Sequence, residues 1–127
     1  MEKKYPKPLR TLFLVHSLMM AGFAGIYLLI PVQWGDLTGC LSNQAPQVFR
    51  MFGTSILGMA VLSFLSYRAA TWQEVKLAAW TNCIMPILFS LVILAGLLFW
   101  SLPSIAWMYL VVMVAFAIAF NAATFQR

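Results

Sequence analysis

The sequence predicts an all-α integral membrane protein, a single four-helix bundle over residues 1–127. Composition is the first reason: hydrophobic residues make up 63% of the chain and charged residues 9%, whereas a soluble domain is about half apolar and a quarter charged. The second reason is that the apolar residues gather in four long runs. Each run is long enough to cross the roughly 30 Å of membrane hydrocarbon, which takes about 20 helical residues.

Prolines and polar residues between these runs indicate where each helix is expected to begin and end. Membrane spans are expected at about residues 11–30, 47–67, 77–100 and 105–123. Pro31 ends the first run, and Pro46 opens the second at a position that suits the first turn of a helix; a polar loop is expected between them. Pro86 lies inside the third run and should kink that helix. The links are short, and the one around Pro103 is the shortest, so we expect antiparallel neighbours in an up-down-up-down bundle.

The positive charges predict the orientation of the bundle in the membrane. With these spans, all the Lys and Arg residues except Arg50 fall on one side, namely Lys3, Lys4, Lys7, Arg10, Arg68, Lys76 and Arg127. Because such residues gather on the cytoplasmic side, both termini are expected to be cytoplasmic. Aromatic residues near the span ends, such as Trp72 on the inner side and Trp107 on the outer side, agree with belts at both interfaces.

Several classes of function are disfavoured by what the chain lacks. The cations form no basic stripe, so nucleic acid is not an expected partner. No cluster of His, Cys, Asp and Glu has metal-ligand spacing, and neither a metal nor another cofactor is expected. No set of nucleophile, base and orienting residue stands out, so we do not expect an enzyme. The three acidic residues all fall outside the spans, which argues against proton-coupled export through a membrane carboxylate.

The two cysteines predict neither a disulfide nor a redox motif, since Cys40 and Cys83 are far apart and form no C-x-x-C pair. The stretch Leu37–Cys40 is similar to a lipoprotein cleavage site. In lipoproteins that site follows the apolar run directly, whereas here residues that include Pro31, Trp34 and Asp36 intervene. We therefore expect the first span to be retained, and modification of Cys40 is left open.

Arg50, near the start of the second span, allows two interpretations. At the outer interface its long side chain can extend to the headgroups at little cost, which makes it an anchor paired with Asp36 or a lipid phosphate. Alternatively, it binds an anionic headgroup or a carboxylate of a partner.

Arg50 and Gly53, an Arg-x-x-Gly at the start of the second span, precede an apolar run that contains Gly and Ala and ends at Arg68. Together with the "YLLIP" that ends the first span, this pattern resembles small bacterial four-helix membrane proteins of the DoxX-like and DUF4345-like kind. The resemblance covers the topology of most of the chain. It implies a bundle in the bacterial plasma (inner) membrane, but no particular reaction.

Polar residues in the four spans fall at a similar depth toward the cytoplasmic side. They are His16 and Ser17, then Ser63 and Ser66, then Thr81, Asn82 and Cys83, and finally Asn121. In lipid such groups favour partners on neighbouring helices, so one interpretation is a belt that sets helix register. The other is a small binding site around His16, Asn82 and Asn121, because an ionisable residue within the membrane is a functional candidate.

Small residues predict where helices approach closely. The candidates are Gly53 and Gly58 on the second span, and Ala115, Ala119 and Ala123 on the fourth. They either close this bundle or dock it against another chain, a copy of itself or a larger membrane protein. We therefore expect an accessory or scaffold subunit that docks laterally in the lipid. The alternative is a small lipid- or solute-binding or transport protein that uses the inner polar belt around His16 and Asn82.

Overall fold

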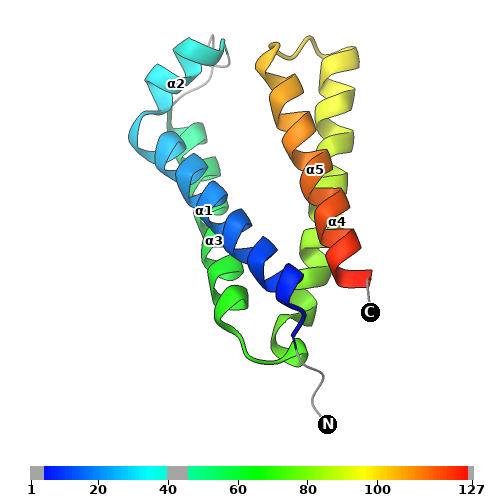
Figure 1. The fold of residues 1–127 in the computed structure, drawn as a ribbon. Coiled ribbons are helices and arrows are strands. Elements are labelled where there is room, and N and C mark those ends of the chain that lie inside the picture. The colour runs from blue at the N-terminus through cyan, green and yellow to red at the C-terminus, as the bar shows by residue number, and fades with distance from the viewer. Residues whose placement is uncertain (1–4, 40–45, 126–127) are drawn as a thin grey trace. The chain divides into compact units, whose positions relative to one another are not determined.

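The computed structural model describes residues 5–39 and 46–125. These residues form five helices, labelled in Figure 1: α1 (Lys7–Leu29), α2 (Pro31–Thr38), α3 (Pro46–Arg68), α4 (Trp72–Phe99) and α5 (Ile105–Phe125). All except α2 are long and apolar enough to cross a membrane. This confirms the predicted helical class with four segments that could span a membrane, which suggests a multi-pass membrane protein. Residues 1–4, 40–45, 126 and 127 lie outside the described ranges; these include Lys3, Lys4, Arg127 and Cys40, on which part of the sequence argument rests.

Each predicted span overlaps one of the four long helices, and two of these helices begin earlier than the expected spans. α1 begins at Lys7 and α4 at Trp72, because charged and polar residues are good helix formers outside the hydrocarbon. At the start of α4, Oε2 of Glu74 accepts hydrogen bonds from the backbone N–H groups of Ala70 at 2.9 Å and Thr71 at 3.4 Å. Such bonds satisfy donors that a helix start otherwise leaves without partners.

The prediction of a polar loop after Pro31 is wrong in part, because this segment contains an additional helix, α2. Pro31 takes the first helical position of α2, where its missing N–H costs nothing, and Gly39 ends the helix with a φ of 71°. Proline at the start and glycine just past the end are the ordinary signals of a helix. The helix has only 8 residues, too few to span a membrane, so an analysis based on spanning length passes over it.

The chain divides into two compact units, with the boundary inside α1. Residues Phe13–Arg68 form the first, called the α1–α3 unit, and the described residues on either side of this range form the second, called the α4–α5 unit.

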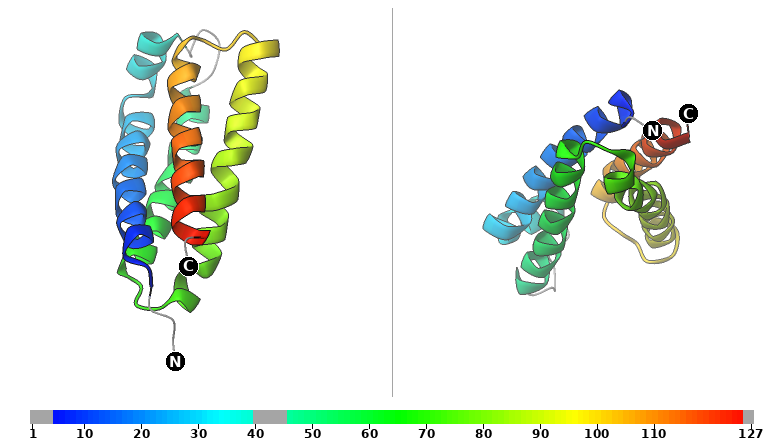
Figure 2. Two further views of the ribbon diagram at one scale, coloured as in Figure 1. Left: turned by 45° about the vertical axis from the view of Figure 1, so that its right-hand side comes forward. Right: turned by 90° about the horizontal axis from the view of Figure 1, so that it is seen from below.

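Within the α1–α3 unit, α1 and α3 run antiparallel and touch along their length. Tyr27, near the end of α1, stacks on Phe49 at the start of α3 with ring centroids 5.8 Å apart. Toward the other end, His16 of α1 meets Ser63 of α3. The closest approach is at Gly53, where an added Cβ would lie 2.9 Å from Cβ of Tyr27. Figure 2 shows α1 and α3 side by side from two further directions.

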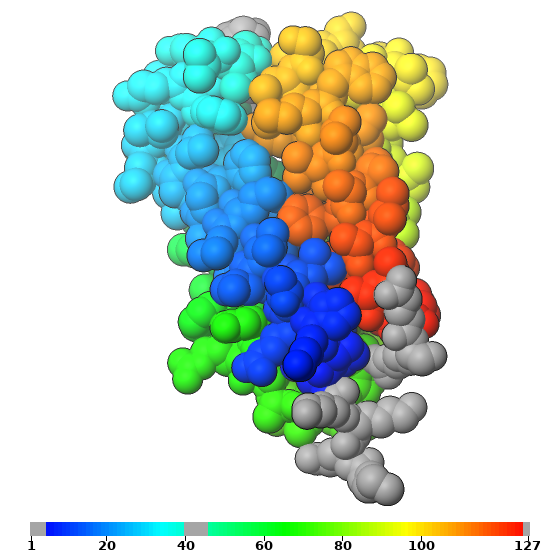
Figure 3. Space-filling model, viewed as in Figure 1, coloured from blue at the N-terminus to red at the C-terminus, as the bar shows by residue number. Residues whose placement is uncertain are grey.

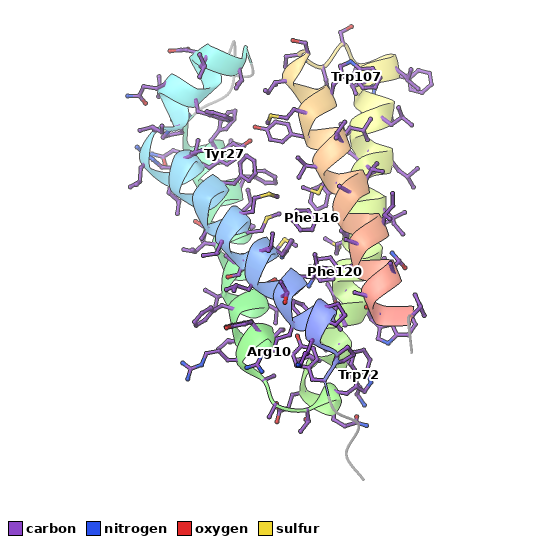
Figure 4. All side chains as sticks on the ribbon, viewed as in Figure 1. Arg10, Tyr27, Trp72, Trp107, Phe116 and Phe120 are labelled. Atoms are coloured by element: carbon purple, nitrogen blue, oxygen red, sulfur yellow. The ribbon has the colours of Figure 1, made fainter. Side chains whose placement is uncertain are left out.

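The α4–α5 unit is an antiparallel hairpin of two spans. Trp80 near the start of α4 packs edge-on against Phe125 at the end of α5, with centroids 5.3 Å apart. Figure 4 shows Trp72 and Trp107 near opposite ends of this hairpin, the arrangement that aromatic belts at two interfaces require. α4 continues through Pro86 as one helix, and the expected kink stays a prediction.

The turn between α4 and α5 closes on Gly96. The backbone N–H groups of Trp100 and Leu102 both donate to the carbonyl oxygen of Gly96, at 3.0 and 3.3 Å. The side chain of Leu102 covers Gly96 so closely that an added Cβ would clash with it. Between these two residues, Ser101 has a φ of 51°, in the left-handed region that favours glycine.

Ser101→Gly is therefore expected to stabilise the hairpin by about 1 kcal/mol, since the left-handed conformation costs a residue with a Cβ about that much. Ser104→Gly is the matched control, because Ser104 lies in the same turn without a positive φ and should lose rather than gain stability. The free energy of unfolding of both variants, measured in mixed micelles by circular dichroism, checks the difference.

Candidate functional site

A buried hydrogen-bonded cluster joins α1 to α3 through His16, Ser17 and Ser63. His16 is 2% exposed, and its Nδ1 lies 2.8 Å from Oγ of Ser63; which of the two donates depends on the histidine tautomer. One residue further along α1, Oγ of Ser17 donates to the carbonyl oxygen of Ala60 at 2.9 Å. The two bonds lock the register of α1 against α3, because a slide of either helix would separate both pairs.

A second buried cluster joins α4 to α5. Nδ2 of Asn121 donates to the carbonyl oxygens of Cys83 on α4 at 3.3 Å and of Ala117 on its own helix at 2.7 Å. The Cys83 thiol also lies 3.5 Å from Oγ1 of Thr124. Asn82, which is 2% exposed, donates to the carbonyl of Ala78 in its own helix at 3.0 Å.

Each unit contains part of the predicted polar belt. His16, Ser17 and Ser63 belong to the α1–α3 unit, whereas the α4–α5 unit holds a second set, namely Asn82, Cys83, Asn121 and Thr124. A belt that runs through all four spans stays a prediction.

The remaining polar side chains of the belt bond within their own helices. Ser66 donates to the carbonyl of Leu62 at 2.8 Å, and Thr81 donates to the carbonyl of Leu77 at 2.9 Å. Thr124 was missed from the sequence, although its spacing of three residues from Asn121 indicates the same helix face.

Arg50 is exposed on α3, at the fifth residue of the helix. Its carbonyl oxygen accepts a hydrogen bond from Thr54 at 2.9 Å. Asp36 is exposed as well, and in residues 5–39 and 46–125 no ion pair joins it to Arg50. A position near one end of a spanning helix suits an anchor at the membrane interface. The choice between an anchor and a binding arginine stays a prediction.

The small residues singled out from the sequence separate into packed and exposed positions. Gly53 is buried against α1, where a Cβ would lie within 3.3 Å of three atoms of Tyr27 and Leu28. Gly58 is exposed, and a Cβ there would meet nothing within 4 Å. On α5, Ala115 is exposed, Ala119 half-buried and Ala123 buried. Gly53 and Ala123 are therefore packed positions. At Gly58 no atom of the described residues lies within 4 Å of an added Cβ, and the close helix approach expected there stays a prediction.

Just before α1, Tyr5 is buried in the α4–α5 unit, with 6% of its surface exposed. Burial raises the pKa of its phenol above the ordinary value, and the positive charge of Arg10 opposes this shift. The phenol is therefore neutral at physiological pH and offers no charge to a ligand.

Both clusters hold neighbouring helices together. Across the described ranges, no three His, Cys, Asp or Glu side chains gather as metal ligands do. The bonds of Ser17 and Asn121 end on backbone carbonyls of neighbouring helices, as in interhelical polar contacts that stabilise membrane bundles. No family model, curated protein or solved structure matches the chain. The resemblance to DoxX-like and DUF4345-like proteins therefore stays a prediction.

Proposed function

We propose that this protein is a non-catalytic accessory or scaffold subunit that docks laterally, within the lipid, to a larger membrane complex. The observation that carries the proposal is a pair of exposed small residues on α3, Thr54 and Gly58. These residues are four apart and so lie on one helix face. Because a Cβ at Gly58 would meet nothing within 4 Å, the backbone of a foreign helix has room to approach there.

The hydrogen bonds of the buried polar side chains support the same role. The buried hydroxyls of Ser17 and Ser63 and the amide of Asn121 are used in bonds between the helices of their own unit. By contrast, large apolar side chains such as Leu91 and Val111 are exposed along the spans. Such a surface suits lipid and the flanks of other membrane helices.

The orientation we propose has both termini on the cytoplasmic side of a bacterial plasma membrane. In the α1–α3 unit, Arg68 ends α3 while Arg50 lies near its start, so the two cations mark opposite ends of one span. In the α4–α5 unit, Lys7 and Lys76 stand near the starts of α1 and α4. An excess of cations at the ends marked by Lys7, Arg68 and Lys76 is what the positive-inside rule associates with the cytoplasm.

Native mass spectrometry of the protein, released gently from its own membrane, tests the docking role. The wild-type chain is expected to leave the membrane with a fixed set of larger subunits. Gly58→Leu should reduce this co-release at least tenfold, because the leucine fills the space that a partner backbone needs, while the helical circular dichroism stays unchanged.

Gly22→Leu is the matched control. Gly22 is an exposed glycine on α1 with nothing within 4 Å of an added Cβ, but its neighbours four residues away, Leu18 and Ile26, are large. This variant should keep the partners. A wild-type chain released alone, or a Gly58→Leu chain that keeps its partners, contradicts the proposal. A lone chain that carries a defined lipid or small molecule favours the alternative role in lipid or solute handling.

A further inference from the structure

Helix α2 has two chemically different exposed sides. Its buried residues, Pro31 and Gly35, are four apart and form one face, and α2 packs on α3. Trp34 and Leu37 are three apart and share a second side; Leu37 is 79% exposed. Gln33 and Asp36, also three apart and both exposed, share a third side. This third side lies opposite the packed face, and Val32, which is 43% exposed, lies beside Asp36. A helix that exposes both apolar and polar side chains is typical of a boundary between two solvents.

The length of α1 fixes where α2 lies along the membrane normal. α1 has 23 residues, about 35 Å at 1.5 Å per residue, which slightly exceeds the roughly 30 Å of hydrocarbon. A single residue, Ile30, separates it from α2. With a φ of −130° and a ψ of 46°, Ile30 lies outside the helical range, and Figure 1 shows the chain changing direction there. α2 therefore begins near the hydrocarbon boundary and does not continue α1.

The register of α3 gives the same depth independently. Gly53 lies against Tyr27 and Leu28 at the end of α1. Arg50, almost one turn earlier on the antiparallel α3, is consequently level with the start of α2. An exposed guanidinium needs water or headgroups. Exposed apolar residues at this end, Leu29 at 81% and Leu37 at 79%, are favoured by hydrocarbon, and the interfacial layer supplies both surroundings.

We propose that α2 is an interfacial helix that lies along the phospholipid headgroup layer, with Trp34 and Leu37 toward the acyl chains and Gln33 and Asp36 toward water. Figure 3 shows the side chains of α2, in cyan, forming the surface at this end of the α1–α3 unit. The surface is thus a lipid contact that holds the α1–α3 unit at a fixed depth. It does not depend on whether the chain docks to a larger complex.

Spin labels in phosphatidylcholine–phosphatidylglycerol vesicles test this position. Single cysteines are introduced as Leu37→Cys and Gln33→Cys in a Cys40→Ser background. Cys83 is kept, since it is buried, and the unmodified background shows whether it takes up label. Leu91→Cys, exposed within the apolar part of α4 and eight residues from its end, is the reference for the bilayer interior. Collisions with oxygen, which concentrates in hydrocarbon, are compared with collisions with a water-soluble nickel chelate.

The label at position 37 is expected to collide more often with oxygen than with the chelate. Its ratio of oxygen to chelate collisions should lie between the ratios at positions 91 and 33, and the label at position 33 should collide more often with the chelate. Equal chelate access at 37 and 33 would show that α2 stands in water. A ratio at 37 equal to that at 91 would show that α2 lies within the hydrocarbon. Low access to both reagents at 37 would show a protein contact. Each of these three results overturns the proposal.

Quenching of Trp34 fluorescence by brominated lipids tests the same position without a spin label. The other tryptophans are replaced by phenylalanine, and quenching should be strongest for bromine near the headgroups.

Discussion

Gly53→Ala is expected to destabilise the α1–α3 unit by about 1–3 kcal/mol, the usual cost of forcing extra volume into a packed contact. The added Cβ would lie 2.9 Å from Cβ of Tyr27 and 3.3 Å from the backbone nitrogen of Leu28. Neither atom can move without moving α1 itself, so the helices must separate. The free energy of unfolding in mixed micelles, followed by circular dichroism during titration with sodium dodecyl sulfate, measures the loss.

Gly58→Ala is the control for this prediction, since it adds the same methyl group to the same helix. A Cβ at Gly58 meets nothing within 4 Å, and alanine forms helices better than glycine by about 1 kcal/mol in water. The variant should therefore be neutral or slightly more stable. Equal losses at the two positions would show that the α1–α3 contact is not centred on Gly53.

Ser63→Ala is expected to cost about 1–2 kcal/mol, because it removes the hydroxyl that lies 2.8 Å from Nδ1 of His16, a side chain that is only 2% exposed. Unfolding in the same mixed micelles measures this loss. A double-mutant cycle with His16→Leu isolates the pair and should show a coupling of about 0.6–1.7 kcal/mol, the range found for hydrogen bonds between membrane helices.

Ser66→Ala is the matched variant on the same face of α3. Ser66 is buried like Ser63, but its hydroxyl donates to the carbonyl of Leu62 within its own helix, and that carbonyl keeps its place in the helix without it. The expected change is below about 0.5 kcal/mol. If Ser66→Ala costs as much as Ser63→Ala, burial of a hydroxyl rather than the link to His16 accounts for the effect.

The location of polar residues could be predicted better than their partners. Comparing depths indicated correctly that His16 and Ser63 lie at one level, and they bond. The same comparison grouped Asn82 with them, yet its amide bonds to Ala78 one turn away in its own helix. The depth of a residue along the membrane normal restricts only one coordinate of its side chain. Rotation of each helix about its axis decides which neighbour a polar group meets.

Gly53 and Gly58 show the same limit for small residues. Both stand in α3 amid apolar neighbours, and nothing in the sequence separates the buried one from the exposed one. In a soluble protein the polar side of the helix would have identified the exposed face. In lipid, the side that faces acyl chains and the side that faces another helix are both apolar, so hydrophobic periodicity does not report the rotation.

The sequence by itself determined the four spanning segments, because only long apolar helices satisfy their backbone hydrogen bonds within hydrocarbon. It also carried the terminal signals of α2, Pro31 and Gly39, which spanning length alone overlooks. Only the tertiary structure decided that Gly53 rather than Gly58 meets α1, and that His16 pairs with Ser63. These contacts depend on how each helix is turned about its axis, and that rotation is set by side-chain packing between helices rather than by hydrophobicity.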